Sequence, residues 1–187
     1  DGREEAYVWQ KTLGTALDQN DDISFIVSAG DQTQHGDRAN EWAGTLSPAA
    51  LRSYAMATTV GNHDRKGETY PFYVNNPNEY HGTTPANVDE NYWFRYGDVL
   101  FIVYNTQIFN VYDQYQFTLD AIAKNPDATW RVAMLHHDLY GTGHHAADDD
   151  NKLLTAIYSS LIDRFEIDVC LTGHEHLYGR SFFMKDT

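Results

Sequence analysis

The stretch that decides the predicted fold is residues 57–64, ATTVGNHD, in which an apolar run of strand length ends at a glycine and three polar side chains. Three other apolar runs also end in polar side chains, after a glycine at residues 23–31 (ISFIVSAGD) and 167–176 (IDVCLTGHEH) and without one at 129–137 (TWRVAMLHH). Glycine at such a point lets the chain turn sharply off the strand and approach an ion closely. We therefore predict four strands that each deliver polar side chains at the strand end.

Helical patterns lie between these runs. Ala6, Trp9, Leu13, Ala16 and Leu17 recur at steps of three and four residues and form one apolar stripe. Strands that alternate with helices, together with a hairpin, predict an α/β fold with a mixed sheet. The other expected elements are helices over residues 47–55, 113–124 and 151–165, a hairpin over 91–105 and a long loop over 65–90.

Composition narrows the class of protein. The chain has 187 residues, 42% of them hydrophobic and 21% charged, which favours one folded domain and excludes a disordered chain. It contains no membrane-spanning run and its first residues are too polar for a signal peptide. With 13 basic and 27 acidic residues the net charge is −14, which disfavours non-specific nucleic-acid binding. We expect no nucleic-acid partner, and the oligomeric state is not readable.

Residue types at the strand ends predict a metal site. The chain has nine histidines and one cysteine, Cys170, so imidazole and carboxylate rather than thiolate would hold a metal. Ligands bind at the carboxyl ends of strands in open α/β sheets. If the strands are neighbours, one pocket collects the following side chains: Asp31, Asn62, His63, His136, His174 and His176.

These motifs, in this order, resemble the calcineurin-like metallophosphoesterases, the superfamily that includes the purple acid phosphatases. The matching residues are Gly30-Asp31, Gly61-Asn62-His63-Asp64, His136 and Gly173-His174-Glu175-His176, and the resemblance extends from residue 23 to 180. It implies an αββα sandwich of mixed sheets flanked by helices. It also implies two divalent or trivalent metal ions, such as Fe, Zn or Mn, and hydrolysis of small-molecule phosphate esters by a metal-activated water.

The resemblance also implies a role for each site residue. Asp31 would bridge the two metals, His176 would bind the first, and the second would take Asn62, His136 and His174. His63 would contact the phosphate or protonate the leaving group, with Asp64 orienting it. The stretch from His136 to His145 resembles the purple acid phosphatase segment in which a ligand histidine precedes a tyrosine and a histidine pair. His144 and His145 would then line the substrate side on a mobile loop, and the alternative is a solvent loop.

The chain departs from the family pattern in two places. Gln34 stands where purple acid phosphatases carry a tyrosine, so a tyrosinate-bound Fe(III) site is not expected. The first family motif follows a strand about thirty residues before the bridging aspartate, and no apolar run leads into Asp1. We expect that motif upstream of residue 1 and further strands beyond the last motif, so that residues 1–187 are the greater part of a catalytic domain. The resemblance favours an extracytoplasmic location, because many relatives are exported.

Three functions compete at this stage. The first is a phosphomonoesterase of the purple acid phosphatase type. The second is a phosphodiesterase or nucleotide hydrolase on the same metals, in which aromatic side chains near the motifs could stack on a base. The third is a catalytically weak metal-binding domain without a complete first metal site. The aromatic residues in question are Trp42, Tyr70, Phe72, Tyr73 and Tyr80.

Overall fold

The chain forms two β-sheets that face each other. The computed structural model describes residues 2–83, 91–108, 110–141 and 143–182. The smaller sheet pairs β1 (Ile26–Ser28) with β2 (Met56–Thr58) in parallel. The larger has the order β3-β4-β5-β6, with β3 and β4 antiparallel and the other pairs parallel. Its strands are β3 (Tyr92–Tyr96), β4 (Val99–Val103), β5 (Trp130–Met134) and β6 (Val169–Leu171).

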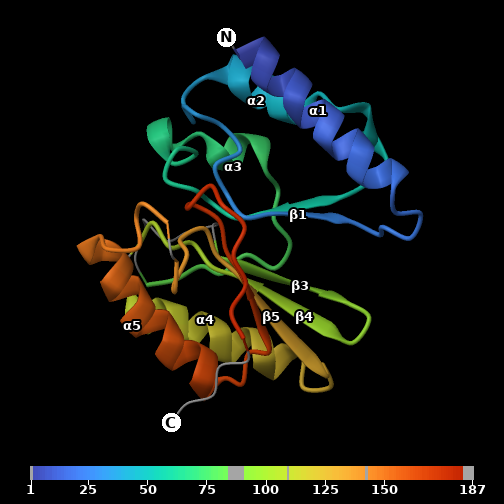
Figure 1. The fold of residues 1–187 in the computed structure, drawn as a ribbon. Helices are drawn as coiled ribbons and strands as arrows, with labels where there is room; N and C mark the ends of the chain where they lie inside the picture. Colours follow the sequence, from blue (N-terminus) through green and yellow to red (C-terminus); the bar gives the residue numbers. More distant parts are fainter. Residues whose placement is uncertain (1, 84–90, 109, 142, 183–187) are drawn as a thin grey trace.

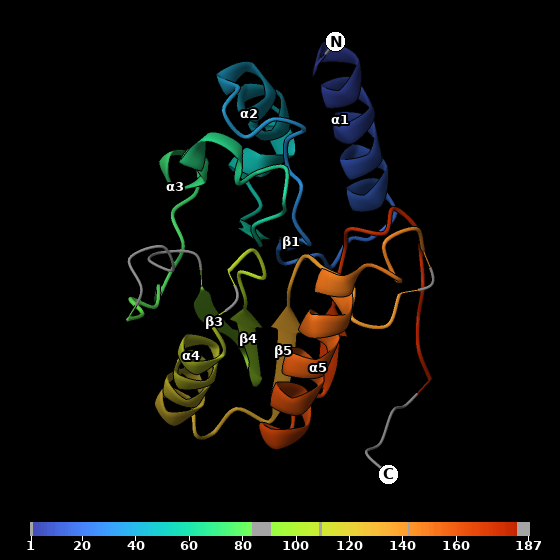
Figure 2. The same ribbon diagram turned by 90° about the vertical axis from the view of Figure 1, so that its left-hand side faces the viewer.

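Helices cover the outer faces of both sheets (Figures 1 and 2). Two of them, α1 (Gly2–Asp18) and α2 (Ala39–Leu46), lie beyond β1 and β2, whereas α4 (Val111–Lys124) and α5 (Asp149–Arg164) lie on the larger sheet. The layers therefore run helix, sheet, sheet, helix, which confirms the expected αββα sandwich. Among the described residues, no helix is long and apolar enough to cross a membrane.

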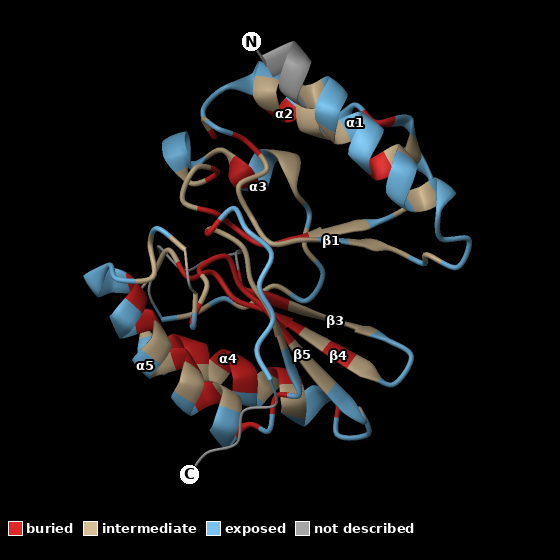
Figure 3. Cartoon of the chain, in the orientation of Figure 1, coloured by how far each residue is buried: buried red, intermediate tan, exposed pale blue. Residues whose placement is uncertain are grey.

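The central strand β4 of the larger sheet has buried side chains on both faces. Leu100 and Ile102 of β4 point to α4 and α5, where they join the main apolar core with Phe117 and Tyr158. Val103, the next residue along, belongs to a separate cluster on the face toward the smaller sheet. Figure 3 shows buried residues along β4 and on the inner sides of the two helices. Such burial on both faces is the usual state of sheets with parallel strands.

Aromatic rings join the two sheets. Phe25, just before β1, contacts Phe94 of β3 and Phe101 of β4 edge to face, at ring-centroid distances of 5.6 and 5.4 Å. The buried Tyr92 hydroxyl donates a hydrogen bond of 2.7 Å to the Thr58 carbonyl at the end of β2. The ring contacts and the buried hydrogen bond fix how the strands of one sheet lie against those of the other.

The segment around Ser47 differs from its prediction. Instead of opening a helix, Ser47 ends α2, because its hydroxyl and its N–H both bond to the Gly44 carbonyl. Pro48 is extended, and a single 3₁₀ turn follows at Ala49–Arg52. The predicted loop over residues 65–90 contains a 3₁₀ turn at Lys66–Glu68 and the short helix α3 (Tyr70–Tyr73). Its residues 84–90 lie outside the described part of the chain.

The aromatic residues that might stack on a nucleobase are mostly used in packing. Trp42 and Tyr70 are each 1% exposed, and Trp42 stacks on Tyr73 at 4.8 Å. Tyr80 packs against Phe117 of the main core, and only Phe72 is largely exposed in this set. Trp42 and Tyr70 are therefore unavailable for stacking on a base, whereas Tyr73 and Tyr80 are half-buried and Phe72 is exposed.

Candidate metal centre

Four strand ends meet at one edge of the sandwich. Asp31 follows β1, Asn62 follows β2, His136 follows β5 and His174 follows β6. One potential ligand atom from each of Asp31, His136 and His174 lies within 4.8 Å of the other two. The structure thus brings together the four side chains that the sequence places around the second metal. Their role as ligands remains a prediction.

His136 lies at the centre of this cluster and is 1% exposed. Its Nδ1 lies 2.7 Å from the Ala29 carbonyl, which can only accept, so Nδ1 carries a proton. Its Nε2 faces the other three residues. That nitrogen is 3.0 Å from Asn62 Oδ1, 3.2 Å from His174 Nδ1 and 3.4 Å from an Asp31 carboxylate oxygen. A backbone carbonyl that fixes the tautomer of a histidine in this way is typical of metal sites.

The charge states of the cluster suit a cation. Burial lowers the pKa of His174, and the neighbouring His136 and His145 lower it further, which favours the neutral imidazole that binds metals. Burial alone would raise the pKa of Asp31, but contacts with His136 in its protonated form and with the His63 N–H outweigh it and lower that pKa in the metal-free cluster. The cluster therefore presents one anionic oxygen, one amide oxygen and two imidazole nitrogens to a common point.

These donors fit Zn, Fe or Mn. When His136 is neutral, with its proton on Nδ1, its Nε2 lone pair points at the Asp31 carboxylate and the Asn62 amide oxygen. Those oxygens also present lone pairs, so the groups repel one another. A cation between them relieves that repulsion. Mixed nitrogen and oxygen donors of this kind are borderline ligands suited to first-row transition metals and zinc rather than to calcium.

The backbone around the cluster is in an unusual conformation. Asp31, His174 and His176 all have positive φ, at 54°, 70° and 53°. Side chains with a Cβ rarely adopt this region, and such residues gather at functional sites where surrounding contacts hold them in place. Gly61 makes the approach of β2 to β1 possible, because a Cβ there would collide with the Asp31 carboxylate and backbone nitrogen.

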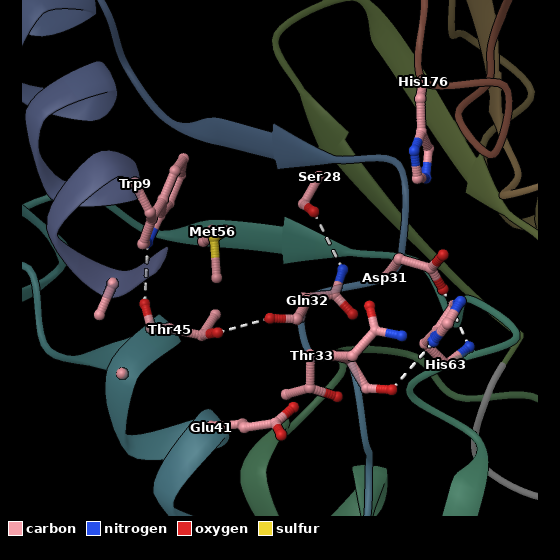
Figure 4. A pocket seen from close by; sticks show the side chains of 13 residues that line it. Trp9, Ser28, Asp31, Gln32, Thr33, Glu41, Thr45, Met56, His63 and His176 are labelled. Carbon is pink, nitrogen blue, oxygen red and sulfur yellow. Dashed lines mark hydrogen bonds between the residues drawn. The ribbon is translucent and has the colours of Figure 1, made fainter. Parts of the chain in front are cut away.

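A pocket of about 370 Å³ opens beside the cluster, between the smaller sheet and helices α1 and α2. Asp31, His63 and His176 line one end of it, and Figure 4 shows the ring of His176 directed toward Asp31 and His63. Trp9 and Met56 form an apolar part at the other end. Asp31 thus lies between the buried cluster on one side and this open pocket, with His176, on the other.

The orientation of His63 corrects one expectation. Its Nδ1 lies 2.9 Å from the Gln34 carbonyl and 3.2 Å from the Lys66 ammonium, so Nε2 is the nitrogen that is left free. Asp64 does not orient this ring. Its carboxylate is fully buried and accepts from the N–H groups of Thr33 and Gly61, at 2.9 and 3.0 Å. Burial raises the pKa of Asp64, and the carboxylate holds the turn after β2 against the turn after β1.

The histidine pair lies beside His174 and outside the lining of the pocket. The ring of His145 contacts that of His174, with centroids 4.4 Å apart, whereas the exposed His144 contacts the ring of His145. His145 Nδ1 is 2.9 Å from an Asp148 carboxylate oxygen, which raises the pKa of His145. Asp148 occupies the N-cap of α5 but makes no capping bond with its side chain. His145 thus lies beside a candidate ligand, and His144 is connected to that ligand through the ring of His145.

Comparison with known proteins now decides the family. The family model described as calcineurin-like phosphoesterase matches residues 6–178. The chain belongs to this family. No curated protein matches it by sequence. Among solved structures it is similar to the purple acid phosphatase PPD1 from seeds of yellow lupin (Lupinus luteus), with 16% identity and a TM-score of 0.58. That match covers 89% of this chain and 32% of the lupin chain, so this chain spans about a third of that protein, and at this identity the likeness concerns the fold alone.

In this calcineurin-like phosphoesterase, sequence reasoning missed the groups that orient the histidines. The Gln34 carbonyl holds His63, and its role depends on backbone direction rather than on residue type. Thr106, after β4, holds the buried His137 through a contact of 2.7 Å between Oγ1 and Nδ1. Burial lowers the pKa of His137 to about 4, with His136 and His174 adding to the effect. A strand-end threonine gives no motif, so no pattern would have revealed it.

We predict that Gly61→Ala weakens metal binding by about 10–100-fold, the usual range when a group supporting a ligand is changed. The added Cβ would displace Asp31, because it would collide with that carboxylate. Gly14→Ala is the matched control, since no atom lies within 4 Å of the Cβ position in α1. Titration calorimetry with Zn²⁺ or Mn²⁺ measures both variants, and equal affinity in the two would contradict the assigned geometry.

Proposed function

We propose that this domain hydrolyses phosphomonoesters with two bound metal ions. Membership of the family supports metal-dependent hydrolysis of phosphoric esters as the general chemistry. The observation that carries the finer proposal is the convergence of Asp31, Asn62, His136 and His174 beside a pocket that also receives His63 and His176. Donors for metals and groups that can bind a phosphate or donate a proton are thus within one small region.

In this proposal Asp31 would help to hold both metal ions. Asn62, His136 and His174 would hold the ion at the buried position, and His176 would hold the ion nearer the pocket. When bound, the metals would supply positive charge for the phosphate oxygens and lower the pKa of a water molecule toward neutrality. The chain's one cysteine, Cys170, packs against the core, and burial raises the pKa of its thiol to about 12, so it is a poor nucleophile.

The chain's histidines would bind substrate and move the proton. His63 presents its Nε2, since its Nδ1 contacts the Gln34 carbonyl and the Lys66 ammonium, and it can donate to a phosphate or leaving-group oxygen only when that Nε2 is protonated. Lys66 lies 3.2 Å from the ring of His63 and adds positive charge at the rim. His145, held by Asp148, lies on the other side of His174 and can serve the same purpose from there.

Two observations favour a monoester over a diester. A monoester dianion has three unesterified oxygens, one more than a diester, and cationic or donor groups flank the cluster on both sides to meet them. These groups are His63 with Lys66 on one side and His145 on the other. Of the aromatic rings that would have supported a nucleotide substrate, Trp42 and Tyr70 are buried, and Tyr73 and Tyr80 pack against other rings. The lupin purple acid phosphatase supports the same substrate class by its name alone.

The direct test compares p-nitrophenyl phosphate with its bis(p-nitrophenyl) ester, each with Zn²⁺, Mn²⁺ or Fe²⁺ added. We expect the monoester to be hydrolysed with the higher kcat/KM and a chelator to abolish both activities. Faster hydrolysis of the diester would replace the proposal with a phosphodiesterase. Absence of both activities in metal-loaded protein would favour a domain that binds metal without turnover.

We predict that His63→Asn lowers kcat by about 10²–10⁴-fold, the usual contribution of a positioned acid, while metal content stays nearly unchanged. The reason is that Asp31 accepts from the backbone N–H of residue 63, which the variant keeps. His35→Asn is the matched control, because the His35 ring contacts Glu41 rather than the cluster. If His63→Asn loses metal instead, the residue is a ligand and the assignment is wrong.

We also predict unequal binding of the two metals. The described residues offer four donors to the buried position but only Asp31 and His176 to the open one, and each missing ligand leaves a position to water. Calorimetry on residues 1–187 should therefore show one tight ion and one weak ion. His174→Ala should remove the tight event, whereas His176→Ala should affect the weak one alone. Two tight ions of equal affinity would contradict this arrangement.

A further inference from the structure

We propose that Glu175 is a positioning residue that holds His145 against the metal cluster. It joins the ligand loop, residues 173–176, to the substrate-side loop, residues 143–148. The inference rests on the proposed function, because it gives Glu175 a role in the hydrolysis assigned above. Neither family motif nor metal chemistry requires a carboxyl group at this position, which lies between His174 and His176.

The backbone of the ligand loop directs Glu175 away from the pocket. His174 and His176 are both in the left-handed region, and the Glu175 N–H bonds to the Gly173 carbonyl at 2.8 Å, which makes a tight turn. As a result the three consecutive side chains point in different directions. His174 joins the cluster, His176 is exposed at the pocket, and Glu175 is buried, with 8% exposure.

The carboxyl group of Glu175 lies directly under the substrate-side loop. Its Oε2 accepts a hydrogen bond of 3.3 Å from the backbone N–H of His145. A Cβ on Gly143 would collide with the same oxygen, and one on Gly141 would come within 3.1 Å of Glu175 Cγ. The two glycines therefore leave the space that the Glu175 side chain fills. The substrate-side loop and this carboxyl group are in close contact.

A purely space-filling role does not explain this side chain. Its Oε1 is buried and has no hydrogen-bond partner among the described residues. Burying an unpaired polar atom destabilises a fold, so an apolar side chain of equal size would fill the gap better. The contact that requires a polar group here is the one from Oε2 to the His145 N–H.

Fixing that backbone group fixes a ring beside the metal cluster. The His145 ring lies 4.4 Å from that of His174, between centroids, and its Nδ1 bonds to Asp148. Glu175 therefore holds the backbone of residue 145 while Asp148 holds its ring. Held at both points, His145 keeps Nε2 free for substrate. Positioned groups lose much of their effect when they are displaced by about 1 Å.

The kinetic test is a double-mutant cycle on p-nitrophenyl phosphate hydrolysis. Glu175→Leu keeps the volume but removes the acceptor, and we expect kcat to fall by about 10–100-fold with metal content unchanged. Glu175→Gln keeps an acceptor and should retain most of the activity. When His145 is already replaced by alanine, Glu175→Leu should lower kcat little further, because the effects of residues that act as a unit do not add. Gly143→Ala should resemble Glu175→Leu.

A second measurement needs no activity. Amide hydrogen exchange in the metal-free chain should be faster across residues 143–148 in Glu175→Leu than in the wild type or in Glu175→Gln, with the melting temperature checked for each. If wild-type protein hydrolyses no phosphoester, the proposed function fails. The exchange rates still test whether Glu175 holds the backbone of residue 145. Equal amide exchange in all variants would overturn the inference. So would an effect of Glu175→Leu on kcat that is as large in the His145→Ala variant as in the wild type.

Discussion

The hydrogen bond from His136 Nδ1 to the Ala29 carbonyl is the contact on which the site geometry depends. It joins the end of β5 in one sheet to the end of β1 in the other, over 107 residues of sequence. By using the proton on Nδ1 it directs the lone pair on Nε2 at Asp31, Asn62 and His174. The same bond thus sets both the distance between the sheets at this edge and the tautomer that a metal requires.

Holding these donors together has a cost that the rest of the fold offsets. Asp31 and His174 adopt a backbone conformation that side chains with a Cβ disfavour, and a buried carboxylate, Asp64, spans the turns after β1 and β2. Such features persist only where surrounding structure determines them. The aromatic contacts of Phe25 and the buried core beneath α4 and α5 supply that support away from the site.

The two sides of the cluster are built differently. On the pocket side, a backbone carbonyl orients His63, so its position follows from the turn after β1. On the other side, His145 lies on a connection between β5 and α5, and two carboxyl groups hold it, one on its backbone and one on its ring. The first arrangement tolerates changes of side chain at the supporting residue, whereas the second depends on residue type at Glu175 and Asp148.

The sequence by itself determined the strand-end motifs and hence the family, because glycine followed by Asp, Asn or His after an apolar run is a local pattern. Most long elements were predictable for the same reason, as the apolar periodicity of α4 and α5 shows. The helix α2 was not predicted, since its eight residues contain Gly44 and little apolar repeat. Local propensity also misread Ser47, which fits the end of one helix as readily as the start of another.

Only the tertiary structure decided which partner each side chain takes. Asp64 follows His63 in sequence and seemed suited to orient it, but the turn directs the carboxylate to Thr33 and Gly61. Glu175 lies between two histidines of one motif, yet the left-handed backbone conformation of both histidines makes the three side chains point in different directions. Sequence spacing sets which residues are near along the chain. The direction of each side chain depends on φ and on contacts with segments far away in sequence, and those exist only in the folded protein.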